Sequence, residues 1–287
     1  MTTGAIPTWR TELVEVGPKA YAYTQHPGTA GISNAGLVVG EEWALVVDAM
    51  LVPSMTRPFL EQVRRVTSLP IHLLVNTHHH GDHVFGNQFV GAQHVIGHPY
   101  CREEMLRSGP ASLENNKRTR PQYADDWRQI EITAPDVTFE EKMVLHVGDT
   151  TVELLYLGGP AHTYGDVVVY LPQHQLLFAG DLAFYYITPT AHDGHVSGWI
   201  RVIDRIQEMA IETIVPGHGP VGDRRELAQV REYLTLIRRQ ARRCFRAGMS
   251  LEEAARTVRI PKYGGWGEQG WVARNVGRLY QEFRGEI

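Results

Sequence analysis

Four short apolar segments of this sequence each run into a turn that carries histidine or aspartate. Their length and apolar character predict strands, and they cover residues 71–76, 151–156, 175–179 and 213–215. The turns that follow them cover residues 77–83, 158–163, 180–181 and 216–219. Because a rigid sheet can present side chains from the loops at its strand ends, the repetition predicts a single site that gathers all four turns.

The first turn, THHHGDH, holds four of the chain's fourteen histidines within six residues. His78 and His80 can project together from an extended loop while His79 points away, and Asp82 and His83 add an oxygen and a nitrogen. Each later turn adds one candidate ligand: His162, Asp181 and His218. Neutral imidazole and carboxylate are the donors that zinc accepts in hydrolytic sites. A lone His-x-His is more often a solvated pair, but the repeated pattern favours a metal site.

The remaining sequence predicts alternating groups of strands and helices. Further strands are expected at residues 11–16, 20–24, 32–39, 43–48, 94–97, 143–147 and 167–171, and helices at 53–66, 99–107 and 197–210. Residues 108–128 are polar and allow a helical excursion or a lid, and the chain is mostly helical from about residue 223, with a Gly/Trp-rich break at 263–267. This order predicts a layered α/β (α+β) fold, and 287 residues of which 43% are hydrophobic can bury a sizeable core.

Composition excludes several classes of protein. A net charge of −4 is too balanced to indicate a nucleic-acid or acidic-membrane partner. No stretch approaches the roughly 18 apolar residues of a membrane span, and the first residues lack the pattern of a secretory signal. Cys101 and Cys244 have no metal-site spacing and fit a reducing compartment. We therefore expect a cytoplasmic protein that acts on a small molecule.

The ordered motifs resemble those of the metallo-β-lactamase-fold hydrolases, with a ligand set like that of glyoxalase II and the lactonases. The resemblance covers roughly residues 32–218 and implies an αββα sandwich with the metals at one edge of its two sheets. It implies one domain over residues 1–287, with a helical C-terminal extension at about 223–287. Two zinc ions are implied, although iron or manganese also accept such ligands. The implied ligands are His78, His80 and His162 for the first ion, Asp82, His83 and His218 for the second, and Asp181 as the bridge.

Such a site implies a hydrolase that uses a metal-bound hydroxide to cleave an ester, lactone or thioester. Asp82 could orient the hydroxide proton as well as bind metal. Thr163 and Asp166 are candidates to hold the imidazoles from behind. Residues 182–195 are expected to shape the substrate pocket, and Tyr185 or His195 to protonate a leaving group or bind an acyl oxygen.

Three alternatives stay open at this point. Lactonases of the family often carry tyrosine three residues after the bridging aspartate, where this chain has Phe184. A β-lactamase-like amide hydrolase is disfavoured by Asp181, because such enzymes usually have cysteine or serine there. An iron-dependent oxidoreductase or sulfur dioxygenase on the same fold would not need the full second set of ligands. Arginines 238–239 and 242–243 could serve a glutathione thioester, but a solvated helix face is the favoured explanation.

Overall fold

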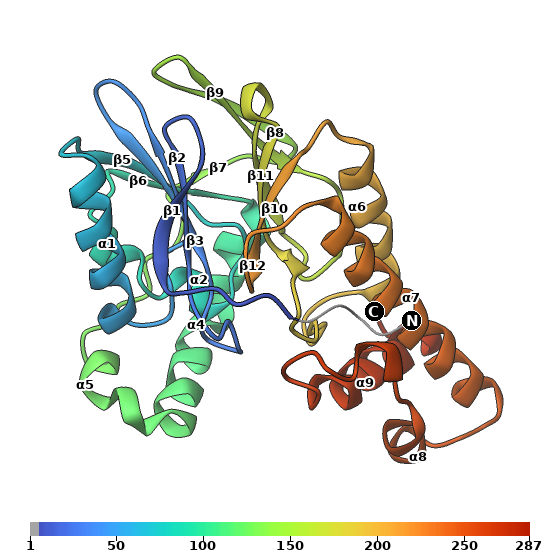
Figure 1. Cartoon of the computed structure of the whole chain (residues 1–287). Coiled ribbons are helices and arrows are strands. Elements are labelled where there is room, and N and C mark those ends of the chain that lie inside the picture. Colours follow the sequence, from blue (N-terminus) through green and yellow to red (C-terminus); the bar gives the residue numbers. More distant parts are fainter. Residues whose placement is uncertain (1–5) are drawn as a thin grey trace.

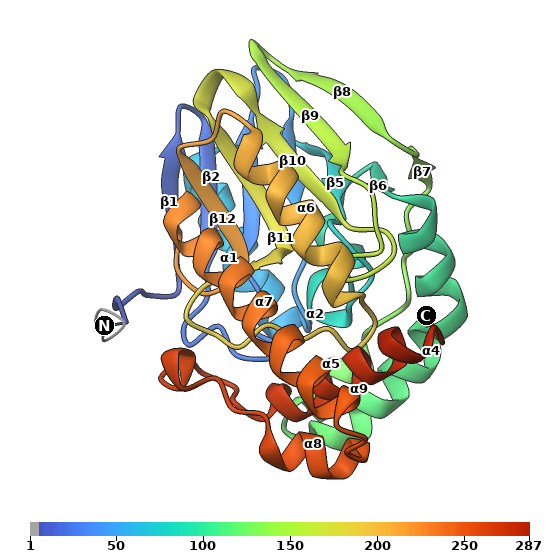
Figure 2. The same cartoon turned by 90° about the vertical axis from the view of Figure 1, so that its right-hand side faces the viewer.

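Two β-sheets face each other in the computed structural model, with helices on both outer faces (Figure 1). The structure describes residues 6–287. Helix α1 covers the outside of the first sheet, and helices α6 and α7 cover the outside of the second (Figures 1 and 2). This arrangement is the αββα sandwich that the resemblance implied. No helix in the described part of the chain is long and apolar enough to cross a membrane.

The first sheet has seven strands in sequence order. They are β1 (Glu12–Gly17), β2 (Ala20–Thr24), β3 (Ala35–Val39), β4 (Ala44–Val47), β5 (Ile71–Val75), β6 (His94–Gly97) and β7 (Val137–Thr138). The first four form an antiparallel meander, whereas β4 to β7 pair in parallel. The parallel crossovers contain α1 (Pro53–Val66), α2 (Gly81–Val84), α3 (Asn87–Val90), α4 (Pro99–Thr119), η1 (Pro121–Tyr123) and α5 (Ala124–Trp127).

The second sheet has five strands in the order β12-β11-β10-β9-β8. They are β8 (Lys142–Val147), β9 (Thr150–Tyr156), β10 (Val167–Leu171), β11 (Leu176–Phe184) and β12 (Thr213–His218). The helical elements of this half are η2 (Pro172–His174), α6 (Val196–Glu208), α7 (Arg224–Arg246), α8 (Leu251–Thr257), η3 (Pro261–Tyr263) and α9 (Trp271–Arg284). All pairs are antiparallel except β11 with β12.

Alternating apolar residues of the two sheets meet in the space between them. Leu45 and Val75 from the first sheet belong to one buried cluster with Leu154, Val169 and Phe178 from the second. The outer faces are covered by amphipathic helices, whose apolar residues recur every three or four positions. The C-terminal helices α7 to α9 share one buried cluster with α6 and the second sheet. They therefore pack on the sandwich and lie near the edge where the strand ends meet.

The structure differs from expectation at α4 and β11. Helix α4 continues to Thr119, through the polar stretch that the sequence left open, because Cys101, Met105, Gly109 and Leu113 bury one face at a spacing of four residues. Strand β11 continues past residue 179, where Gly180 had suggested a turn. Gly180 instead sits in an irregularity of the strand pairing, with a φ of +49°. The short strand β7 was not expected.

Candidate metal centre

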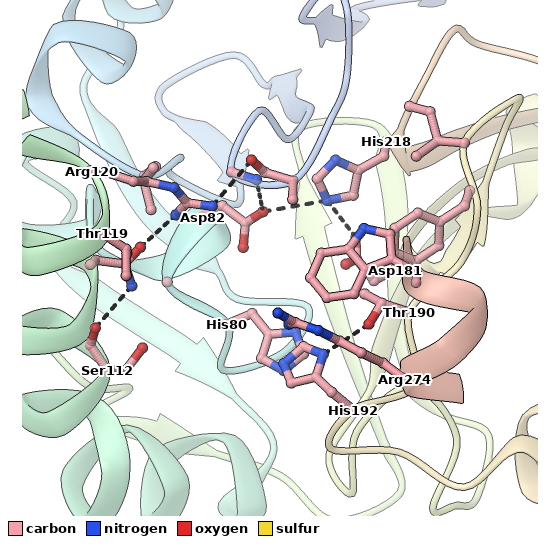
Figure 3. A pocket seen from close by; sticks show the side chains of 18 of the residues that line it. His80, Asp82, Ser112, Thr119, Arg120, Asp181, Thr190, His192, His218 and Arg274 are labelled. Carbon is pink, nitrogen blue, oxygen red and sulfur yellow. Dashed lines mark hydrogen bonds and ion pairs between the residues drawn. The ribbon is translucent and has the colours of Figure 1, made fainter. Parts of the chain in front are cut away.

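The seven expected ligands come together at one edge of the sandwich. The turn after β5 carries four of them, the turn after β9 carries one, and strands β11 and β12 carry one each near their carboxyl ends. They are His78, His80, Asp82, His83, His162, Asp181 and His218, and their potential ligand atoms fall into two groups. Figure 3 shows some of these side chains around a common pocket. Sequence spacing thus identified residues that the fold assembles from four separate segments.

The first group consists of three imidazole nitrogens and one carboxylate oxygen. His80 Nδ1 lies 3.1 Å from His78 Nε2 and 2.9 Å from His162 Nε2. Asp181 Oδ2 lies 3.2 Å from His162 Nε2 and 3.7 Å from His78 Nε2. Ligands at zinc-like bond lengths on a tetrahedron are separated by about 3.3 Å. Four donors at these separations can enclose one cation.

The second group shares Asp181 with the first. Its other oxygen, Oδ1, lies 3.1 Å from His83 Nε2 and 3.5 Å from His218 Nε2. Asp82 Oδ2 completes the group at 3.4 Å from His218 Nε2. Because the two oxygens of Asp181 face different groups, this carboxylate can bridge two cations.

Two buried atoms of the second group indicate what it holds. Within residues 6–287, neither His83 Nε2 nor Asp181 Oδ1 has a hydrogen-bond partner. Buried polar atoms are rarely left in this state, because each loses its hydration without compensation. A cation between the two atoms would satisfy both, and the N/O donor set is one that divalent metals accept. The residues therefore fit the metals that the fold implies.

Charge is distributed unevenly over the ligand histidines. Burial lowers the pKa of His78 and His80 well below the usual value. Burial also disfavours the charged form of His83, but the carboxylates of Asp181 and Asp48 outweigh it and raise the pKa of His83 well above its usual value. In the same way, Asp181 and Asp82 outweigh burial and raise the pKa of His218 to about 10. The second group therefore attracts positive charge more strongly than the first.

The ring nitrogen of each imidazole that faces away from the ligand cluster contacts an oxygen atom, and this contact holds the ring in place. His83 Nδ1 lies 2.8 Å from Asp48 Oδ2. The other contacts are His78 Nδ1 to Thr77 Oγ1, His80 Nε2 to Asp193 Oδ2, His162 Nδ1 to Thr190 O and His218 Nδ1 to Gly28 O, at 2.9–3.1 Å. Such outer partners set the orientation and tautomer of a metal ligand.

Sequence reasoning missed Asp48 and Asp193 and chose Thr163 and Asp166 instead. Asp166 accepts hydrogen bonds from the backbone and hydroxyl of Thr163, both at 2.8 Å, so this pair shapes the turn after His162. Asp48 follows the apolar strand β4 at the same sheet edge, in the pattern that identified the four ligand turns. Applied to this strand, the same signal would have found it.

Tyr185 and His195 lie outside the pocket. The Tyr185 side chain is buried, and its hydroxyl donates to the Asp223 carbonyl at 3.0 Å, beside the start of α7. His195 is the N-cap of α6, where its Nδ1 accepts a hydrogen bond from the Gly198 backbone at 3.1 Å. The structure therefore gives both residues structural contacts and does not bring them to the ligand cluster. Phe184 does line the pocket and stacks on His218, with ring centroids 5.0 Å apart.

A pocket of about 410 Å³ opens over the ligand cluster. His80, Asp82, Asp181 and His218 form its floor, and the second half of α4 and the start of α9 line its walls. Figure 3 shows Arg120 entering from the α4 side and Arg274 from the α9 side. The polar segment without an assigned role in the sequence is thus a wall of the site. The volume of the pocket is typical of pockets that bind small molecules.

Comparison with known proteins matches residues 28–218 to the family model of the metallo-beta-lactamase superfamily. The chain is 22% identical over 294 residues to a linear primary-alkylsulfatase of a Pseudomonas species, covering 87% of this chain and 55% of that protein. It is 27% identical over 203 residues to a type 2 metallo-beta-lactamase of Bacillus cereus, covering 69% of this chain and 71% of the relative.

Among solved structures, the stereoselective inverting sec-alkylsulfatase Pisa1 from a Pseudomonas species matches with a TM-score of 0.75 at 19% identity. The match covers 96% of this chain and 51% of that one, so it includes the C-terminal helices. The chain spans about half the length of these alkylsulfatases. The two facing sheets, the ordered ligand turns and the family match lead to one conclusion. This chain belongs to the metallo-β-lactamase superfamily, whose members are metal-dependent hydrolases.

Proposed function

We propose that the protein is a dinuclear zinc hydrolase that cleaves an ester, thioester or lactone of a small molecule. The observation that carries this proposal is the position of Asp181. One of its oxygens lies among the first group of donors and the other among the second. When bound there, two zinc ions would lower the pKa of a water molecule, polarise the scissile bond and stabilise the negative charge that develops on it.

The protein's own residues orient the reactants around this centre. Asp82 lines the pocket, and its Oδ2 accepts a hydrogen bond from the Gly31 backbone at 3.0 Å. This contact holds the carboxylate in a defined orientation toward the cavity. Asp82 can therefore orient the proton of an attacking hydroxide in addition to its role as a ligand. Phe184 and Leu51 supply apolar surface, which excludes water from one side of the pocket.

The pocket offers a leaving group little supply of protons, and this favours an oxygen or sulfur ester over an amide as substrate. Tyr185 and His195, the acids expected from the sequence, lie elsewhere in the fold. An alkoxide or thiolate leaves more readily than an amide nitrogen, which needs a proton as the bond breaks. His192 is a protonatable side chain at the pocket and stacks on His80 at 4.6 Å. Desolvation within the pocket lowers the pKa of His192 below its usual value, so little of this imidazole carries a proton to donate.

A sulfate ester is the second candidate substrate. The similarity to a linear primary-alkylsulfatase extends over 87% of this chain. A sulfate ester also has an oxygen leaving group, so its cleavage makes the same demands on the pocket. The substrate panel therefore contains a sulfate ester as well as carboxylic esters.

The experiment combines metal analysis with a substrate panel. We expect close to two zinc ions per chain by mass spectrometry of the digested protein, and loss of activity on treatment with a chelator. The panel contains a 4-nitrophenyl carboxylic ester, a thioester, a lactone, 4-nitrophenyl sulfate and nitrocefin. We expect turnover of at least one of the first four and little turnover of nitrocefin. Efficient nitrocefin hydrolysis alone would contradict the proposal, as would an active protein that holds iron and consumes oxygen.

A further inference from the structure

Two arginines, Arg120 and Arg274, line opposite walls of the pocket and indicate the charge of its substrate. We propose that the substrate is an anion, and that Arg120 and Arg274 bind a carboxylate group that is separate from the bond to be cleaved. This inference rests on the proposed function, because it specifies which kind of ester the site accepts. Neither arginine is a metal ligand or was singled out by a sequence motif.

Within residues 6–287, Arg120 has no carboxylate within ion-pair distance. It follows the last residue of α4, and its guanidinium donates to the side-chain oxygen of Asn116 and, at 3.2 Å, to the backbone carbonyl of Ala30. Both acceptors are neutral. They hold the guanidinium against Gly31, where an added Cβ would lie 3.0 Å from its central carbon. Arg120 is therefore positioned by the loop whose Gly31 backbone N–H also contacts Asp82, and Gly31 separates it from the metal ligand.

Arg274 lies on the opposite wall, in the first turn of α9. Its guanidinium carbon lies 4.4 Å from the centre of the Trp271 ring, and both side chains line the pocket. Stacking on an aromatic face restricts a guanidinium while leaving its N–H donors available at the edge. Across residues 6–287, Arg274 has no carboxylate within ion-pair distance.

The described lining of the pocket offers the two arginines no carboxylate outside the metal centre. Among the described residues that line it, the only carboxylates are Asp82 and Asp181, and both belong to the metal centre. Some arginines of the chain pair with carboxylates, including Arg107 and Arg225, and others, such as Arg201 and Arg205, donate to backbone carbonyls. The two pocket arginines are set apart because both line one cavity over the ligand cluster. Planar guanidinium groups bind carboxylates through paired charge-assisted hydrogen bonds.

The position of the two arginines indicates that they bind a carboxylate other than the group that reacts at the metal centre. Among residues 6–287, neither guanidinium forms a hydrogen bond or ion pair with a ligand side chain, and they approach the cavity from the end of α4 and from α9 (Figure 3). A substrate that reached both walls from the metal floor would place its reactive bond below and its carboxylate between the arginines. The pocket volume of about 410 Å³ accommodates such a small molecule.

The test compares two esters that differ in one group. Mono-4-nitrophenyl adipate carries a free carboxylate, and 4-nitrophenyl hexanoate has the same acyl length without it. We expect the wild-type protein to prefer the adipate. Arg120→Gln combined with Arg274→Gln should lower kcat/KM for the adipate by about 10- to 100-fold, the scale of losing hydrogen bonds to a charged group. Metal content should not change, and kcat/KM for the hexanoate should fall by a smaller factor than kcat/KM for the adipate.

Matched controls separate this effect from a general loss of surface charge. Arg284→Gln alters another arginine of α9, and Arg128→Gln alters one just after α5; neither lines the pocket. Both should retain the adipate preference. Replacing Arg120 and Arg274 by lysine should restore part of it, because the charge returns without the paired geometry. Equal use of both esters by the wild-type protein would overturn the inference. So would a loss confined to 4-nitrophenyl sulfate, where the anion is part of the cleaved bond.

Binding measurements keep the inference separate from the proposed function. The 4-nitroanilides of adipic acid and hexanoic acid carry the same two groups on a bond that resists cleavage. Calorimetric titration of the metal-loaded protein should show tighter binding of the charged anilide, and the double glutamine variant should lose this difference. If no ester is hydrolysed but this difference is seen, the proposed function fails and the anion site stands. If esters are hydrolysed and the two anilides bind equally, the anion site fails alone.

Discussion

The two groups of metal donors share Asp181 but differ in their charge. The first group consists of three histidines and one oxygen of Asp181, and burial lowers the pKa of His78 and His80. The second group contains Asp82 and the other oxygen of Asp181, with Asp48 directly behind His83. These carboxylates outweigh burial and raise the pKa of the second group's histidines.

This difference indicates how each group is stabilised. Neutral imidazoles can bind a cation without first losing a proton, so the first group is organised for metal by its backing contacts. The second group concentrates negative charge in a buried space, which is costly unless a positive charge compensates it. Metal binding and folding are therefore expected to be more closely linked at the second group. Substitutions within the two groups, behind them and outside the site test this comparison.

The largest effect is expected for Asp181→Ala, because this carboxylate belongs to both groups. Zinc content should fall at both positions, and kcat/KM should fall by more than the roughly 100-fold upper range for outer partners of metal ligands. His218→Ala is the matched change in one group only. It should release the second ion and leave the first bound by His78, His80 and His162. Metal analysis and steady-state kinetics measure both variants. Two bound metals and unchanged turnover in Asp181→Ala would show that it does not bridge them.

An intermediate effect is expected for Asp48→Asn, which keeps the size of the side chain but removes its charge. Asp48 has a φ of +59°, a conformation that asparagine also tolerates, so the backbone is not strained by the change. Loss of the carboxylate behind His83 should weaken the second metal by about 10- to 100-fold. The first metal should remain bound.

Asp136→Asn is the control for this substitution. Asp136 forms the same kind of contact, 2.8 Å from His94 Nδ1, but on the exposed surface. It should leave both metals in place. Competition with a chromogenic chelator measures the two affinities in each variant. An equal loss at both positions in Asp48→Asn would contradict the assignment of Asp48 to the second group.

The smallest effect is expected where the structure places a residue outside the site. Tyr185→Phe removes the hydrogen bond to the Asp223 carbonyl, and His195→Ala removes the cap of α6. Each should lower the free energy of unfolding by about 1 kcal/mol, the usual contribution of one hydrogen bond. Metal content and kcat/KM of the folded protein should stay unchanged. Denaturant unfolding and kinetics check both quantities, and a selective fall in kcat would return either residue to the chemistry.

Prediction from the sequence succeeded where local pattern determines position. Apolar segments followed by His- or Asp-bearing residues identified the seven side chains that the fold brings together, because the carboxyl ends of these strands meet at one edge of the sandwich. Asp181 and His218, however, lie within β11 and β12 and not in turns after them. The sequence did not identify a proton donor for the leaving group, because Tyr185 and His195, which were expected to serve, lie outside the pocket. Adjacent side chains of an extended segment point to opposite faces. Because Phe184 lines the pocket, Tyr185 next to it points away, and its hydroxyl reaches the Asp223 carbonyl.

The sequence by itself predicted a layered α/β fold and the candidate donors, since both depend on short-range periodicity and spacing. The family resemblance added the sandwich and the division of the ligands between two ions. Tertiary structure decided which side chains surround these donors. Asp48 reaches His83, and Arg120 and Arg274 face one cavity, only because distant segments pack together. Contacts of this kind depend on how whole helices and strands pack against one another. The burial of apolar surface determines this packing, and no local sequence motif specifies it.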